Sequence, residues 1–269
     1  MKKIIAIAAV LLCAARAYAD QLTDELNAFL KNKTPTTAES LSQDIVQFAI
    51  TDSQTGESML FVIPRQTAWS CMDHLFEKGE AQGLKRMCDA YSATNRNDPF
   101  LYFTRGRLCE VEGELDKAIA EYRQSLIVSP KFSLSKYFLS AFYAFDKNDP
   151  QESQKYRSDF DKDLGAAGER ANVIKKDVVY VITQNGIYLM NKKRDFTAAI
   201  LQFKKALALD PDAEQAQLNL AIAYLNKGKK MRDLALYGQG MELLKRIGRQ
   251  AKDQLARKYA SEVLNEIAE

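Results

Sequence analysis

The sequence predicts an all-α protein whose helical hairpins stack into a solenoid, with a small N-terminal segment and a helix that caps the last hairpin. Two observations carry this prediction. Apolar residues recur every three or four positions through most of the chain, which is typical of helices with one buried face. A pattern of two such helices also returns with a period of 34 residues, and glycine or proline turns separate the helices.

Residues 99–132 carry this pattern most clearly. Gly106 and Cys109 lie at helical spacing in the first predicted helix. Gly113 breaks the chain between the two helices, and Pro130 ends the second. The second helix has an apolar stripe with members three or four residues apart: Leu115, Ala118, Ile119, Tyr122 and Leu126. These features predict one complete helix–turn–helix unit.

Two later stretches repeat the pattern. In residues 180–213, Asp195 begins the second helix, and the apolar positions that follow have the offsets of the first copy. The first helix of this copy fits less well, because Gly186 lies one residue earlier than Gly106 does in its own copy. A third copy begins at Glu214 and has a clear first helix.

The remaining features of the array are weaker. In the last copy, Gly238 and Gly240 predict a modified or longer turn. Residues 65–98 and 133–166 each fill one period and are interpreted as degenerate copies. About 13 residues are then left over near 166–179, and they predict a lengthened connection.

The segment before the array, residues 20–64, allows two interpretations. Two short β-branched runs around a Ser-Gln-Thr-Gly turn favour a β-hairpin over 46–63. Alternatively, Thr36 and Glu39 resemble a capping box at the start of a helix. That helix would place three apolar residues on one face: Leu41, Ile45 and Phe48.

The segment after the array, residues 251–269, predicts an amphipathic helix. Its apolar residues recur every fourth position: Leu255, Tyr259, Val263 and Ile267. Charged residues occupy the opposite face. We expect this helix to cover the last repeat, as the cap that a solenoid needs for solubility.

The repeated unit resembles the tetratricopeptide repeat, a helix–turn–helix of 34 residues. The match includes Gly106 and Ala118, the small residues where the paired helices approach closely, and the aromatic Tyr122. Pro130 closes the unit. The resemblance is assigned to residues 65–250, and it implies a right-handed α-solenoid without a cofactor.

The resemblance also implies a concave groove that is lined by the first helix of each pair and holds a peptide or partner protein. The positions that map to this groove are Phe100, Phe103, Arg107, Tyr137, Gln184, Tyr188, Gln215 and Leu218. Relatives that grip a C-terminal carboxylate use a set of Lys, Asn and Arg there. Only Arg107 is of that kind, so we expect an apolar, aromatic groove. The equally weighted alternative is that several of these side chains pack against neighbouring units.

Residues 70–88 contain the only histidine of the chain and two of its four cysteines. In the repeat register, Cys71 and Cys88 lie on opposite helices of one hairpin, which predicts a disulfide between them. A Cys88–Cys109 bridge and free, buried thiols are the alternatives. A zinc site is disfavoured because structural zinc sites usually have a tight ligand pair at each end. A Cys71–His74 catalytic pair is disfavoured because no oxyanion donor is recognisable nearby.

Catalytic motifs are not recognisable in the sequence. A single histidine excludes most hydrolase triads and His-rich metal sites. No P-loop, GxGxxG or GxSxG pattern occurs. The carboxylates Glu110, Glu112 and Glu114 surround Gly113 and are interpreted as a solvated turn. The sequence therefore predicts a protein that is not an enzyme, and two-carboxylate catalysis is an alternative without specific support.

The first 19 residues predict a secretory signal peptide. Lys2 and Lys3 precede an apolar run of about twelve residues, and Ala17-Tyr18-Ala19 forms a small-x-small cleavage site. Cys13 is disfavoured as a lipid-attachment site because the bulky Leu12 precedes it. We expect cleavage after Ala19 and an exported protein, periplasmic or secreted. The short, lysine-led signal favours a bacterial source.

Charge and hydropathy exclude several kinds of partner. The chain has 38 basic and 35 acidic residues, and removal of the signal peptide would take away three basic residues and no acidic one. The mature chain would then be formally neutral, which predicts no nucleic-acid or anionic-membrane partner. No stretch after the signal peptide reaches transmembrane length.

Together these features predict a non-enzymatic scaffold or adaptor of the bacterial envelope. It would bind a peptide or a partner protein through the concave face of the repeats. The runner-up is an exported assembly chaperone that binds its clients transiently. No cofactor and no particular oligomeric state are predicted.

Overall fold

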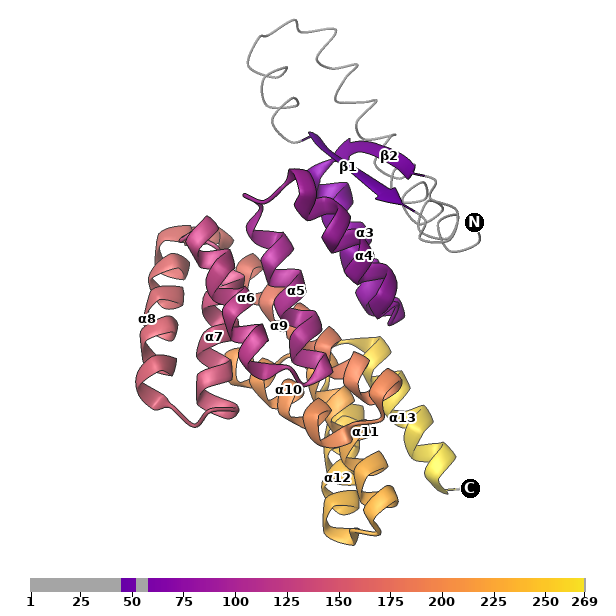
Figure 1. The fold of residues 1–269 in the computed structure, drawn as a ribbon. Helices are drawn as coiled ribbons and strands as arrows, with labels where there is room; N and C mark the ends of the chain where they lie inside the picture. Colours follow the sequence, from indigo (N-terminus) through magenta and orange to yellow (C-terminus); the bar gives the residue numbers. More distant parts are fainter. Residues whose placement is uncertain (1–44, 52–57, 269) are drawn as a thin grey trace, which may run out of the picture. The chain divides into compact units, whose positions relative to one another are not determined.

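The computed structural model describes residues 45–51 and 58–268 and divides the chain into two compact units, Met1–Pro130 and Lys131–Glu269 (Figure 1). We call them the N-terminal and the C-terminal unit. The predicted signal peptide and residues 20–44 lie outside the described residues. Among the described residues, no helix is both long enough and apolar enough to span a bilayer.

The N-terminal unit begins with a two-stranded antiparallel sheet. β1 (Ile45–Thr51) pairs with β2 (Ser58–Pro64), so that Thr51 lies opposite Ser58. The β-hairpin prediction for 46–63 is therefore confirmed, and its turn lies outside the described residues. Along β1, Val46 and Phe48 are buried while Gln47 is exposed, which is the two-residue alternation of a half-buried strand.

Two helical hairpins follow the sheet in the N-terminal unit. The first consists of α3 (Arg65–Lys78) and α4 (Ala81–Thr94), and the second of α5 (Pro99–Glu112) and α6 (Leu115–Val128). Gly79 and Gly113 form the two turns with positive φ angles of 72° and 82°, which favour glycine. The helices α4 and α3 both pack against α5, so the two hairpins stack on each other. The ring of Phe48 in β1 packs edge-on against Tyr91 in α4, with centroids 5.6 Å apart.

The C-terminal unit contains three further helical hairpins and a final helix. The helices are α7 (Ser133–Phe145), α8 (Pro150–Ala167), α9 (Ala171–Tyr188), α10 (Phe196–Leu209), α11 (Glu214–Met231), α12 (Leu234–Gln250) and α13 (Gln254–Ala268). A 3-10 turn, η1 (Gly168–Arg170), joins α8 to α9, and a π turn, η2 (Leu189–Lys193), ends α9. Since α11 packs against both α9 and α10, consecutive hairpins stack here too, which confirms the solenoid of helical hairpins.

Residues 166–179 do not form the expected lengthened connection. Apart from the single 3-10 turn, they belong to the last turn of α8 and the first turns of α9. Both helices have 18 residues, against 14 in α5 and α6. The surplus residues were therefore absorbed by longer helices rather than by a loop.

Glycines mark the closest contact between paired helices. A Cβ atom on Gly106 would lie 2.5 Å from a ring atom of Tyr122, and a Cβ atom on Gly186 would lie 2.5 Å from a ring atom of Phe203. Gly186 therefore provides the same close helix contact as Gly106, although along the chain it lies one residue further from the aromatic residue that it meets. The π turn η2 accounts for this offset, because a π turn accommodates one extra residue within a helix.

The variant Gly186→Ala tests this contact. The added methyl group would meet the fully buried ring of Phe203, so we expect the free energy of unfolding to fall by about 1–3 kcal/mol. Gly165→Ala is the matched control, because a Cβ atom at Gly165 in α8 meets nothing within 4 Å. There we expect a gain of up to about 1 kcal/mol from helix propensity. Urea denaturation followed by circular dichroism measures both, and equal effects would contradict the contact.

In the last hairpin Gly228 and Gly240 also lie at a helix contact, and the prediction of a modified or longer turn at Gly238 and Gly240 is wrong. Both residues lie inside α12. A Cβ atom on Gly240 would lie 2.8 Å from the carbonyl oxygen of Ala221, and one on Gly228 would lie 2.7 Å from the backbone nitrogen of Tyr237. α11 and α12 can therefore pack backbone to backbone.

The helix α13 covers the last hairpin, but with a different face from the expected one. Ala256 and Ala260 are buried in the cluster formed with α11 and α12, whereas Leu255 is 75% and Tyr259 is 51% exposed. Val263 and Ile267 pack partly against the same cluster, as expected. Small alanine side chains let α13 approach closely, and this turns the two larger residues outward.

Candidate functional site

Most of the predicted groove residues are buried within their own unit. Six of the eight are at most 7% exposed: Phe100, Phe103, Arg107, Tyr137, Tyr188 and Leu218. Gln184 is half-buried and Gln215 is exposed. For the six buried side chains the structure supports the alternative interpretation, packing inside the array. Only Gln184 and Gln215 retain access to a partner.

In the N-terminal unit, Arg107 joins α5 to α3. Its Nη1 lies 2.6 Å from Oδ1 of Asp73, and its guanidinium carbon lies 4.0 Å from the ring centroid of Phe76. Burial raises the pKa of the Asp73 carboxyl, and the nearby Arg107 partly offsets this shift. Because Arg107 is 1% exposed, its charge holds the hairpins together instead of facing a partner.

A second buried hydrogen-bonding centre in this unit was not predicted. Asp98 is fully buried, and its Oδ2 accepts hydrogen bonds from Trp69 Nε1 at 2.9 Å, from Arg65 Nη1 at 3.1 Å and from the Tyr91 hydroxyl. Its Oδ1 accepts from the backbone N–H of Phe100 at 3.0 Å and so caps α5. Burial, together with the hydrogen bond and charge of Asp98, raises the pKa of Tyr91. The sequence signal was the Asp-Pro pair before a helix, which predicts a cap but not its tertiary partners.

In the C-terminal unit, a buried ion pair links α7 to α10. Lys205 Nζ lies 2.6 Å from Oδ2 of Asp146, and the two side chains are 2% and 10% exposed. The same ammonium lies 5.1 Å from the ring centroid of Phe142. The hydroxyl of Tyr137 donates a hydrogen bond of 2.9 Å to the carbonyl oxygen of Lys205. Tyr137, a predicted groove residue, therefore serves the packing of this unit.

One first helix nevertheless exposes apolar side chains. On α9, Val173 is 57% and Tyr180 is 53% exposed, and the two lie seven residues apart, about two helical turns. The half-buried Gln184 follows one turn after Tyr180 on the same face. We call these three residues the accessible face of α9.

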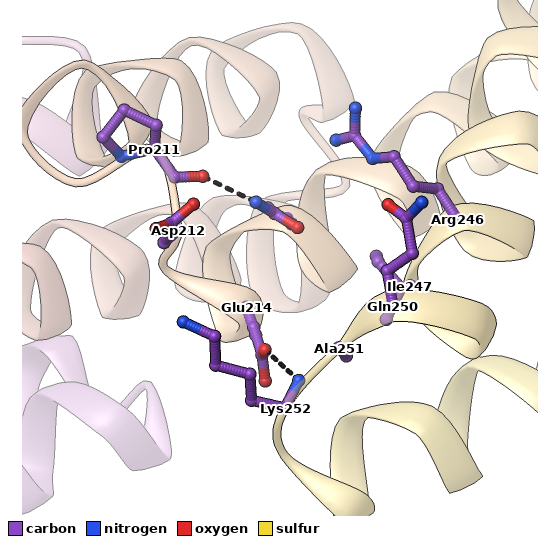
Figure 2. Close-up of a pocket in the computed structure, with 9 residues that line it drawn as sticks. Pro211, Asp212, Glu214, Arg246, Ile247, Gln250, Ala251 and Lys252 are labelled. Atoms are coloured by element: carbon purple, nitrogen blue, oxygen red, sulfur yellow. Dashed lines mark hydrogen bonds between the residues drawn. The ribbon is translucent and has the colours of Figure 1, made fainter.

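A pocket of about 430 Å³ lies at the beginning of α11, beside the exposed Gln215 (Figure 2). Its lining residues come from the α10–α11 loop, α11, α12 and the α12–α13 link: Pro211, Asp212, Glu214, Gln217, Arg246, Ile247, Gln250, Ala251 and Lys252. Gln217 Nε2 donates a hydrogen bond of 2.6 Å to the carbonyl oxygen of Pro211. The carboxylate of Glu214 accepts the backbone N–H groups of Lys252 and Asp253, the latter at 2.8 Å. These bonds fix the walls of the pocket and leave Arg246 and Gln250 exposed at its opening.

Three of the four cysteines lie in the part of the chain that the structure describes. Cys71, Cys88 and Cys109 are free thiols in the structure, so it does not contain the predicted Cys71–Cys88 disulfide. Burial raises the pKa of Cys71 and Cys88 to about 12 and that of Cys109 to about 11. The buried pair is therefore protonated near neutral pH and packs as small apolar side chains. An oxidised pair stays a prediction of the sequence.

His74 is half-buried on α3, as its interpretation as an ordinary helix residue expects. In the part of the chain that the structure describes, no group of three or more His, Cys, Asp or Glu side chains is arranged to hold a metal ion.

The comparisons with known proteins concern the repeats. A family model described as a TPR repeat matches residues 191–228, which include α10 and most of α11. Similar solved structures include YrrB, described as a TPR protein with an unusual peptide-binding site. That match has 16% identity and a TM-score of 0.33, and it covers 73% of this chain and 91% of YrrB. The match to yeast Tom70 has 16% identity and a TM-score of 0.38, and it covers 75% of this chain and 39% of Tom70. The match to PilF of Pseudomonas aeruginosa has 16% identity and a TM-score of 0.35, and it covers 76% of this chain and 91% of PilF.

No curated protein sequence matches the chain. The family match includes Phe203, the ring that Gly186 meets from outside the matched residues, and it spans α10 and most of α11, which pack against each other. Repeats of this kind generally act as protein-interaction modules. Residues 191–228 therefore match a tetratricopeptide repeat.

Proposed function

We propose that this protein is a non-enzymatic scaffold of the bacterial envelope that holds a segment of a partner protein in its C-terminal unit. The observation that carries the proposal is the accessible face of α9, where Val173 and Tyr180 are both more than half exposed. The two lie two helical turns apart on one face, and exposed aromatic side chains are enriched at protein-binding surfaces. In tetratricopeptide repeats, the first helix of each pair lines the concave, partner-binding surface.

The pocket at α11 adds a second contact point for the same partner. Its volume of about 430 Å³ is large enough for one or more side chains. Arg246 and Lys252 bring positive charge to the pocket, and Asp212 and Glu214 bring negative charge, so it suits a polar or amide side chain better than a single charge. A segment with one apolar anchor for α9 and one polar side chain for the pocket fits this surface.

The envelope location rests on the predicted signal peptide at residues 1–19. The non-enzymatic assignment is supported by the repeat family, whose members generally bind other proteins. A scaffold should hold its partner in stoichiometric amounts, whereas a chaperone should bind unfolded clients substoichiometrically.

Crosslinking and pull-down of the tagged full chain from native envelope fractions test the proposal. We expect one partner in stoichiometric amount with the natural chain, and at least about tenfold less with Tyr180→Asp, since aromatic anchors dominate binding energies. Ile127→Asp is the matched control, because Ile127 in α6 is 73% exposed and lies in the other unit. The proposal fails if the protein is recovered alone after efficient crosslinking, or if Tyr180→Asp and Ile127→Asp recover the partner equally.

A further inference from the structure

Two neighbouring turns of the C-terminal unit carry a cluster of cations that the packing of the repeats does not use. One turn joins η2 to α10, and the other joins α11 to α12 (Figure 1). We call their basic residues the basic turn cluster: Lys192, Lys193, Arg194, Lys227, Lys229, Lys230 and Arg232. All are exposed except Lys227, which is half-buried.

The two turns have the same construction. Arg194 and Arg232 both adopt a left-handed backbone conformation with φ of 54°, at positions where glycine is the usual residue. The next residue in each turn is an aspartate that caps the following helix. Asp195 accepts the N–H of Ala198 at 3.0 Å, and Asp233 accepts that of Leu236 at 2.9 Å. Both carboxylates are thus committed to helix starts, and both turns carry an arginine where glycine would fit more easily.

The positive charge of the cluster is not neutralised within the described chain. None of its seven cations forms an ion pair with another described residue, unlike Lys205 with Asp146 or Lys136 with Asp163. Two carboxylates accompany seven cations in these turns, while the whole chain has 35 acidic against 38 basic residues. Unpaired positive charge is therefore concentrated at this place, where it favours an anionic partner.

A recess of about 230 Å³ lies between the two turns, so the surface is not flat. Four cations of the cluster line it together with Asp195, Phe196, Thr197 and Met231: Lys193, Arg194, Lys227 and Lys230. Lys230 Nζ lies 5.7 Å from the ring centroid of Phe196. At its edge, Met231 is 63% exposed, and Leu234, just beyond it, is 86% exposed. The recess thus combines ammonium groups with an aromatic ring and a thioether, and can receive a side chain with both apolar and acidic neighbours.

We propose that the basic turn cluster is a second docking surface, which binds an acidic protein segment with an apolar side chain among its carboxylates. The carboxylates would pair with the exposed lysines and arginines, and the apolar side chain would enter the recess beside Phe196. A lipid surface fits less well, because a flat array of headgroups cannot reach the half-buried Lys227 in the recess.

This surface is separate from the one proposed above. The pocket lies at the first turn of α11 and the cluster at its last turns, near opposite ends of a helix of 18 residues that rises about 1.5 Å per residue. One partner segment could occupy the pocket while another chain, or a second part of the same partner, occupies the cluster. The protein would then join two binding events, as a scaffold requires.

Fluorescence anisotropy with the full mature chain tests the proposal. The probe is a labelled synthetic peptide of glutamates around one phenylalanine, and its control replaces each glutamate with glutamine. We expect the glutamate peptide to bind at least about tenfold more tightly than the glutamine peptide, and its affinity to fall as salt is added. Equal affinity for the two peptides would overturn the proposal.

Charge reversal locates the binding site. We expect Lys193→Glu with Lys230→Glu to weaken binding of the acidic peptide by at least about tenfold. Lys204→Glu with Lys258→Glu makes the same change in charge at exposed positions of α10 and α13, and should change binding less than about twofold. If both pairs weaken binding equally, the attraction is diffuse and the site is not at the turns.

Two further arms keep the test decisive. Should the charge-reversed chain unfold, Arg194→Gly with Arg232→Gly removes two charges at backbone positions that favour glycine, and the same loss of affinity is expected. Phosphatidylglycerol vesicles are the second arm. If they bind through the cluster and the acidic peptide does not, the proposal of a protein partner is overturned in favour of a lipid surface. Tyr180→Asp should leave peptide binding unchanged, so failure here is distinguishable from failure of the α9 surface.

Discussion

Replacing Lys205 with methionine is expected to lower the free energy of unfolding by about 3–5 kcal/mol. The ammonium of Lys205 lies 2.6 Å from Asp146, and methionine would fill similar space but leave this carboxylate buried without its cation. Removing one partner of a buried pair costs more than the pair itself contributes, because the remaining charge has lost both water and its counter-charge. The loss should be visible as a lower midpoint in urea denaturation.

Two variants make this prediction specific. Lys204→Met changes the preceding residue, which is exposed on the same helix, and should alter stability by less than about 0.5 kcal/mol. The double variant Lys205→Met with Asp146→Leu should recover part of the loss, because no charge is then left buried alone. Equal stability of Lys205→Met and Lys204→Met would show that the pair does not hold α7 against α10.

Replacing Asp98 with alanine is expected to destabilise the N-terminal unit by about 3 kcal/mol, through the lost cap of α5 and through one buried and one half-buried donor left without this acceptor. Trp69 Nε1 and the Tyr91 hydroxyl both donate to this carboxylate. Asp149→Ala is the matched control, because Asp149 also precedes a proline and caps a helix through the N–H groups of Gln151 and Glu152. Because Asp149→Ala removes only a cap, it should lower the free energy of unfolding by about 1 kcal/mol.

The measurement for Asp98→Ala has a built-in reporter. Trp69 is the only tryptophan of the chain, and its indole N–H is bonded to the carboxylate that the variant removes. We expect its fluorescence to shift to longer wavelength in the native state, and its unfolding transition to occur at lower denaturant. An unchanged spectrum with unchanged stability would contradict the role of Asp98 as the centre of this unit.

Periodicity was sufficient to predict the helical hairpins, because helical spacing and turn residues are local properties of the sequence. The degenerate copies at 65–98 and 133–166 are both helical hairpins, and the β-hairpin was correctly favoured over a helix. The close approach of the paired helices at Gly106 also followed from the repeat pattern, and the structure shows that Tyr122 is its partner there. These features depend on neighbours a few residues away or on the partner helix of the same hairpin.

The partners of the buried charges could not be predicted in this way. Arg107 was predicted to line the groove because of its position in the repeat. In the structure its guanidinium instead donates a hydrogen bond to Asp73, 34 residues earlier, and is buried between the two hairpins. Lys205 and Asp146 lie in different hairpins, and nothing local distinguishes them from solvated charges. In α13, the size of the side chains determined which face is buried, since Ala256 and Ala260 let the helix pack more closely than the leucine and tyrosine of the expected face would.

Apart from Gln184, the residues of the two proposed docking surfaces were not predicted, for a related reason. The repeat register identifies which positions point toward a groove, but the depth to which neighbouring helices cover them depends on helix length. α9 has 18 residues, so Val173 extends the exposed face toward the beginning of the helix, where no groove position was expected. The basic turn cluster lies outside the predicted groove, and the repeat pattern specifies where turns occur but not the charge of the residues beside them.

The π turn at the end of α9 has a consequence for how such an array can change in length. One additional residue between Leu189 and Lys193 widens a single turn, while Gly186 still meets Phe203 and the hairpins that follow keep their stacking. Had the residue been inserted within a regular α-helix, everything before it would have rotated by about 100° relative to everything after it. A wide turn beside a loop thus isolates an insertion, so this chain could gain or lose a single residue there without rebuilding the interfaces between its helical hairpins.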